Sequence, residues 1–169
     1  MPRYDVPNAA PEPLRLVQRF VNTVDHEHGQ EWIGTPEALR DFLGAPAGAE
    51  DVRRALELRE AVRALLRANN GAPLDAAAVA TIGAAARRLR LGLGEGAAVT
   101  IAGEDALDRI VAVAFGAMLD GSWRRLKACP NCRWAFYDYS RNRSASWCSM
   151  QLCGNRLKTR AYRRRRAGA

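Results

Sequence analysis

Apolar positions along the first half of the chain recur with helical spacing, so the sequence predicts a mainly helical fold. The expected helices run from Pro13 to about Asp25, from Thr35 to Gly44, from about Asp51 to Asn69 and from Asp75 to about Arg88. Thr35 and Asp75 are suited to cap helix amino termini, and Gly44 and Gly71 are suited to end helices. These signals place a helical region at the start of the chain.

The apolar pattern changes period in residues 89–102. Leucines alternate at Leu89, Leu91 and Leu93, a Gly-Glu-Gly turn follows at 94–96, and alternation resumes at Val99. This pattern is typical of a β-hairpin. A fifth helix is expected from about Glu104 to Lys127, and its apolar middle predicts that it forms the centre of the core.

Charge divides the chain into two parts. Residues 1–122 carry a net charge of −4, whereas residues 123–169 carry +12 with Asp138 as their single acid. A strongly basic end attracts a polyanion, and nucleic acid is the commonest one. We therefore expect two domains, a helical domain at 1–125 and a basic module at 126–169.

No segment predicts export or membrane insertion. Residues 1–13 contain no apolar stretch of the length that a signal peptide needs. The longest apolar run, residues 110–119, is about ten residues and falls short of the ~20 that span a bilayer. We therefore expect a cytoplasmic, nucleoid-associated protein. Thiols stay reduced in the cytoplasm.

All four cysteines of the chain lie near its end, at Cys129, Cys132, Cys148 and Cys153. The C-x2-C and C-x4-C pairs are separated by 15 residues, which is typical of a zinc site. Four thiolates leave no coordination position open to water, so the expected zinc ion is single and structural. The alternative is that the cysteines fill a core or form disulfides.

The residues between and after the cysteine pairs predict a treble-clef-like finger with a knuckle, a hairpin and a helix. Trp134, Phe136 and Tyr139 are expected in the strands, with residues 141–144 as the turn. Ser149 is suited to cap the helix that carries Cys153. The fold class is therefore mainly α, with one small hairpin in the first domain and a zinc finger after it.

The helix after Cys153 presents a basic outer face when its residues are placed at helical angles. Asparagine and arginine pair with base edges in the major groove, and further arginines suit phosphates. The alternative is a solvated helix end. The candidate nucleic-acid contacts are Arg141, Arg143, Asn155, Arg156, Lys158, Thr159, Arg160, Tyr162, Arg163, Arg164, Arg165 and Arg166.

Residues 129–166, CPNCRWAFYDYSRNRSASWCSMQLCGNRLKTRAYRRRR, closely resemble the CGNR zinc finger, which is named for the tetrapeptide at 153–156. Residues 20–25 (FVNTVD) and 58–61 (LREA) resemble the ABATE domain that usually precedes this finger. The resemblance implies a bacterial, stress-responsive, DNA-binding transcription regulator whose four cysteines bind zinc. The family usually has two arginines before Trp147, whereas this chain has Ala145 and Ser146, which implies weaker phosphate contacts there.

A polar cluster ends the first expected helix. It consists of Asn22, Thr23, Asp25, His26 and His28, and Arg59 and Glu60 of the long helix are expected nearby. These side chains are candidates for a pocket that binds a small-molecule effector. The alternative is a helix terminus with capping side chains and an ion pair.

The leading hypothesis is a zinc-finger transcription regulator that binds DNA, with a first domain that senses a ligand or forms a homodimer. An RNA-binding or ribosome-associated module is one alternative, because the same arginines suit single strands. A zinc-stabilised protein-interaction adaptor is another. An enzyme is not expected, because no nucleophile, base and acid set is present.

Overall fold

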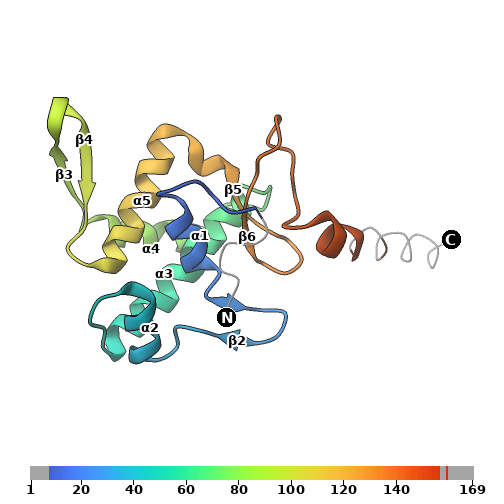
Figure 1. Cartoon of the computed structure of the whole chain (residues 1–169), viewed down its shortest axis with the longest axis horizontal. Coiled ribbons are helices and arrows are strands. Elements are labelled where there is room, and N and C mark those ends of the chain that lie inside the picture. Colours follow the sequence, from blue (N-terminus) through green and yellow to red (C-terminus); the bar gives the residue numbers. More distant parts are fainter. Residues whose placement is uncertain (1–7, 157–158, 160–169) are drawn as a thin grey trace.

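The computed structural model describes residues 8–156 and 159. Helices dominate the first three quarters of the chain, and the finger follows them at the other side of the molecule from the hairpin β3–β4 (Figure 1). The helices are α1 (Arg15–Val21), α2 (Pro36–Leu43), α3 (Ala49–Ala68), α4 (Ala76–Ala86) and α5 (Ala106–Asp120). The predicted mainly helical fold is therefore confirmed.

Three antiparallel strand pairs accompany the helices in the described part of the chain. They are β1 (Val24–Asp25) with β2 (Gln30–Glu31), β3 (Arg90–Leu93) with β4 (Val99–Ala102), and β5 (Leu126–Ala128) with β6 (Ala135–Tyr137). The pair β3–β4 is the hairpin that the alternation of leucines predicted. It stands out from the helices in Figure 1.

Capping residues set several helix ends where the sequence predicted them. The Thr35 hydroxyl accepts a hydrogen bond from the Ala38 amide, and the Asp75 carboxylate accepts two at the start of α4. Gly44 ends α2 in the left-handed conformation, which glycine adopts without steric cost. These ends depend on contacts within a few residues, and such contacts can be read from sequence.

Two expected helices are shorter than predicted. The first ends at Val21, because the chain turns into strand β1 at Val24 instead of continuing to Asp25. The fifth ends at Asp120 instead of Lys127, because Gly121 takes a left-handed conformation with φ of 81°. A 3-10 helix at Ser122–Arg125 then leads into β5, so the residues before the first cysteine form a strand.

One apolar core joins the helices to the finger. Phe20, Leu66 and Ile110 are fully or almost fully buried in it, and they come from α1, α3 and α5. One face of β5–β6, including Leu126 and Ala135, belongs to the same core. The predicted boundary between 125 and 126 thus lies at the start of a strand that packs against the helical region.

No helix in the described part of the chain combines the length and the apolar character that crossing a bilayer requires.

Candidate metal centre and nucleic-acid interface

The first cysteine pair lies in the turn that joins β5 to β6. The Arg133 amide donates to the Cys129 carbonyl at 2.9 Å, and the Cys129 amide donates to the Trp134 carbonyl at 2.9 Å. These bonds close a tight knuckle around Pro130 and Asn131. The strand pairing therefore flanks the knuckle, which corrects the expectation that Trp134 to Tyr139 would pair across a turn at 141–144.

The second cysteine pair is carried by a loop and a short π-helical turn, Met150–Gly154. The Ser149 hydroxyl accepts a hydrogen bond from the Leu152 amide at 3.3 Å, so the predicted cap is confirmed. Gly154 is buried beneath Met150 and Trp147, and an added Cβ would lie 2.5 Å from the Met150 sulfur. The glycine of the CGNR tetrapeptide therefore allows this turn to pack closely behind Cys153.

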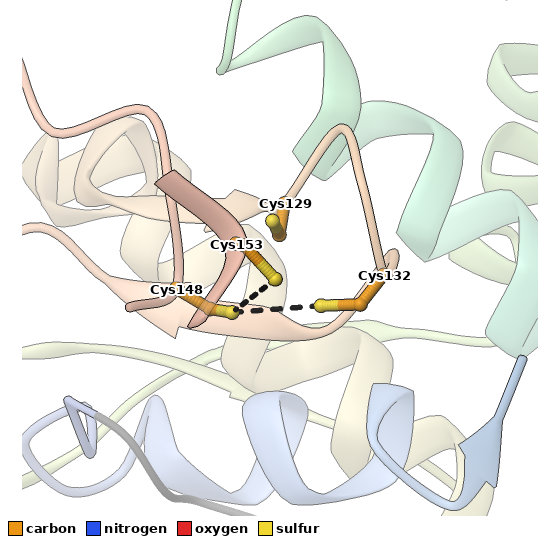
Figure 2. Close-up of side chains that lie close together, drawn as sticks. All are labelled: Cys129, Cys132, Cys148 and Cys153. Atoms are coloured by element: carbon orange, nitrogen blue, oxygen red, sulfur yellow. Dashed lines mark hydrogen bonds between the residues drawn. The ribbon is translucent and has the colours of Figure 1, made fainter. Parts of the chain in front are cut away.

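The four thiols converge on one point (Figure 2). Their sulfur atoms all lie within 4.8 Å of one another, and the Cys132–Cys148 and Cys148–Cys153 separations are 3.5 and 3.6 Å. Zn–S bonds of about 2.3 Å in a tetrahedron place the sulfurs about 3.8 Å apart, whereas a disulfide needs about 2.05 Å. All four cysteines are free thiols, and their spacing fits a tetrahedral zinc site.

The crowding of the thiols also affects their ionisation. Hydrogen bonds from the thiols of Cys132 and Cys148 lower the pKa of Cys129. The contact with Cys129 in turn raises the pKa of Cys132 to about 12, and it raises the pKa of Cys148 as well. Four crowded thiols therefore cannot all ionise by themselves, whereas a divalent metal ion stabilises four thiolates together.

The surroundings of the sulfurs are largely apolar. Phe136 is fully buried against the cysteines, and Trp134 and Trp147 pack beside them. The Asn131 amide group donates to the Cys153 sulfur at 3.4 Å, which is the kind of outer contact that orients a metal ligand. Three of the four cysteines are thus buried, and Cys132 is half-buried at the edge of the centre.

The single acid of the basic segment lies inside the finger. Asp138 is 1% exposed, and its carboxylate accepts a hydrogen bond from the Lys127 ammonium at 2.7 Å. Burial by itself would raise the pKa of Asp138, but hydrogen bonds from Lys127 and Ser140 outweigh that effect and lower it. The carboxylate is therefore ionised, paired and hidden from solvent.

The same ammonium anchors the loop that follows Ser140. Lys127 donates to the carbonyls of Arg143 and Ala145 at 2.7 and 2.9 Å. The side chains of Arg141 and Arg143 are exposed on this loop. The structure therefore holds the backbone of the loop from inside while its two arginines face solvent.

The other predicted nucleic-acid residues follow the metal centre. Asn155, Arg156 and Thr159 are exposed, and the Arg156 guanidinium forms an ion pair with Glu27 in the turn between β1 and β2. That contact with the first domain was not expected. The remaining candidates, Lys158, Arg160, Tyr162, Arg163, Arg164, Arg165 and Arg166, lie outside the described residues.

The residues that were predicted to line an effector pocket have different surroundings in the structure. Thr23 is fully buried and its hydroxyl accepts a hydrogen bond from Arg59, which also pairs with Glu31 at 2.7 Å. Asp25 binds His28 and the turn after β1. Of the predicted set, His26 alone lines a pocket of about 340 Å³. The other walls of this pocket are formed by the knuckle, Glu27 and Arg156.

Asn22 binds the finger. Its amide donates to the Ala135 carbonyl at 3.0 Å, and its oxygen accepts from the Ala135 amide at 2.7 Å. Gln18, one turn earlier on α1, donates to the same carbonyl at 3.2 Å. The side chain of the residue that follows α1 thus satisfies both backbone groups of a β6 residue.

Three residues in the second half of α3 and just after it complete this contact, which the sequence analysis did not predict. The Arg63 guanidinium donates to the Arg133 carbonyl at 2.7 Å. Asn69 donates to the Leu126 carbonyl at 2.9 Å, and Asn70 donates to the Ala128 and Ser146 carbonyls. We call Gln18, Asn22, Arg63, Asn69 and Asn70 the polar clamp. Buried polar side chains on otherwise apolar helix faces were the only available signal.

The fold and the site define a class of protein, a four-cysteine zinc finger joined to a helical domain. The family model of the CGNR zinc finger matches residues 125–166, and that of ABATE, described as "putative stress-induced transcription regulator", matches residues 14–121. The chain belongs to the ABATE family and carries a CGNR zinc finger with one zinc ion at its four cysteines. No curated protein matches the chain.

Proposed function

We propose that this transcription regulator binds duplex DNA through residues 126–169, with residues 1–125 as a domain that senses a ligand or dimerises. The observation that carries the proposal is the burial of Asp138 against Lys127. Because this is the only acid in a segment of net charge +12, the exposed surface of the finger presents positive charge without an opposing carboxylate of its own. Such a surface attracts the phosphate backbone.

The arrangement of the finger suits two kinds of contact. Arg141 and Arg143 project from an anchored loop, so phosphate binding there costs little ordering of the backbone. Asn155 and Arg156 are exposed just after the last cysteine, and both residue types read base edges. Lys158, Arg160 and Tyr162 to Arg166 extend the candidate surface along the sequence.

The ion pair between Glu27 and Arg156 does not oppose this function. Both side chains are partly exposed, and exposed ion pairs contribute only about 0–1 kcal/mol. A DNA phosphate can therefore replace Glu27 at Arg156. Zinc supplies the order of the finger when it is bound, through roughly 10–16 kcal/mol in comparable peptides.

Binding of the purified, zinc-loaded chain to labelled duplex DNA tests the proposal. We expect the logarithm of affinity to fall linearly with the logarithm of salt concentration. Arg141→Ala/Arg143→Ala should reduce that slope by about 2, because each lost phosphate contact removes about 1. The matched control is Arg67→Ala/Arg87→Ala, which removes the same charge from exposed positions on the helical region.

Equal slopes for the two double variants would contradict a phosphate contact by the loop. Preference for single-stranded RNA over duplex DNA in direct competition would replace the proposal with an RNA-binding function. Absence of binding to either at physiological salt would favour a protein-interaction adaptor.

A further inference from the structure

The hairpin β3–β4 exposes an apolar face. The strand register pairs Leu91 with Ile101 and Leu93 with Val99, and directly paired residues point to the same face. Leu91, Leu93 and Val99 are 77%, 75% and 67% exposed. Contiguous exposed apolar side chains of this kind typically mark an interaction surface.

This face continues into a groove along α5. Val99 and Ile101 line the groove, whose volume is about 750 Å³, together with Leu14, Val113 and Leu119. Gly116 also lines it, and a Cβ added there would meet no atom within 4 Å. The centre of the groove is therefore open space beside an apolar helix face.

Opposite charges line the groove at the two ends of α5, and a further acid, Glu12, lines it from the segment before α1. Arg109 lines the groove near the start of α5, and Asp120 lines it at the end of the helix. The two residues are eleven positions apart, which corresponds to about 16 Å along the helix axis at 1.5 Å per residue. Arg109 has no ion pair within residues 8–156 or at 159. The hydrogen bond from Ser122 lowers the pKa of Asp120, so its carboxylate is charged.

We propose that a second copy of this chain occupies the groove, in a two-fold dimer with the two α5 helices antiparallel. Two-fold symmetry requires a self-complementary patch. An axis near the middle of α5 brings Arg109 of each copy opposite Asp120 of the other, and it sets Val113 opposite Gly116. The open space at Gly116 admits α5 of the second copy, and the β3–β4 hairpins of the two copies cover the sides of the helix pair.

This inference names the surface of the dimerising role proposed above for residues 1–125. It adds a consequence for the finger, because a two-fold dimer presents two fingers to two DNA half-sites. Self-association is measured without DNA, so its failure and a failure of DNA binding are separate results.

Analytical ultracentrifugation of the full chain, with a concentration series, tests the proposal. We expect a reversible dimer in the wild type. Gly116→Leu should weaken it about tenfold or more, because the leucine fills the space that the second helix needs. The matched control is Gly83→Leu on α4, because this glycine is also helical and an added Cβ there also meets no atom within 4 Å, but it lies at an exposed position away from the groove. Both leucines favour helix over glycine, so neither should lower the melting temperature.

Charge reversal separates a second copy from any other occupant. Arg109→Asp places like charges together at both ends of the interface and should weaken the dimer. Arg109→Asp/Asp120→Arg exchanges the two charges and should restore it. A wild type that stays monomeric throughout, or a dimer that tolerates Gly116→Leu, would overturn the proposal.

Discussion

The helical region buries large apolar side chains such as Phe20, Leu66 and Ile110 from three helices, whereas the finger buries its cysteines around Phe136. A core of the second kind is too small to offset the conformational entropy of its chain. The finger therefore depends on its metal ion, on the polar clamp and on the face of β5–β6 that packs in the helical core. The comparison teaches that one chain uses two sources of order, and that the two can be perturbed separately.

Removal of a metal ligand should have the largest effect, and it should fall on the finger. We expect Cys153→Ser to abolish tight binding of zinc, because three thiolates and a hydroxyl make a poorer site. The finger should lose protection from hydrogen exchange, while the centres of α3 and α5 keep theirs.

Zinc content and hydrogen exchange, followed residue by residue, measure both effects. Ser149→Ala is the control, since it removes a cap worth about 1 kcal/mol and leaves the four ligands in place. Equal loss of protection in the finger and in α3 would mean that the two regions unfold as one unit.

Loss of the clamp should have an intermediate effect. Asn22→Ala leaves the buried Ala135 amide without its hydrogen-bond acceptor, and an unsatisfied buried group costs about 1–3 kcal/mol. Urea unfolding measures the change. The matched control is Asn155→Ala, an exposed asparagine of the finger, which we expect to change stability by less than about 0.5 kcal/mol.

The smallest expected effect is a difference between the pH ranges in which the helical region and the metal centre lose stability. Burial alone would raise the pKa of Glu31, but hydrogen bonds and charge from Arg59 lower it below its ordinary 4.5. A carboxyl with a lowered folded pKa stabilises the protein fully above its unfolded pKa, and this stability is lost as pH falls through the folded pKa. The contribution of Glu31 to the stability of the helical region should therefore persist until the pH is below 4.5.

The metal centre should fail at higher pH, because protons compete with zinc for thiolates whose ordinary pKa is about 8.5. An acid titration that follows zinc release with a dye and helix content by circular dichroism should show two separate steps. Glu31→Gln should flatten the acid dependence of the second step alone. Coincident steps in the wild type would argue against independent sources of order.

The sequence predicted the helical region well where local contacts decide the structure. Thr35, Asp75 and Gly44 end their helices as expected, because a cap requires only residues a few positions away. The end of α5 was wrong for an opposite reason. Gly121 ends the helix in a left-handed conformation, and the pairing of Leu126–Ala128 with β6, which is not a local contact, then places those residues in a strand.

In the finger, the spacing of the cysteines predicted a metal site, since four ligands must reach one ion. The polar clamp was not predictable, because Asn22 and Ala135 are 113 residues apart and no periodicity links them. Asn22 was instead assigned to an effector pocket. A buried polar side chain requires a hydrogen-bond partner, but the sequence does not identify that partner.

Every bond described from the polar clamp to the finger ends on a main-chain atom, at Leu126, Ala128, Arg133, Ala135 and Ser146. These hydrogen bonds do not depend on which side chains the finger carries at those positions. The outward residues of the finger are therefore free to change without loosening their attachment. A scaffold of this kind can carry fingers with different binding preferences, so divergence of target sites would need no compensating change in the helices.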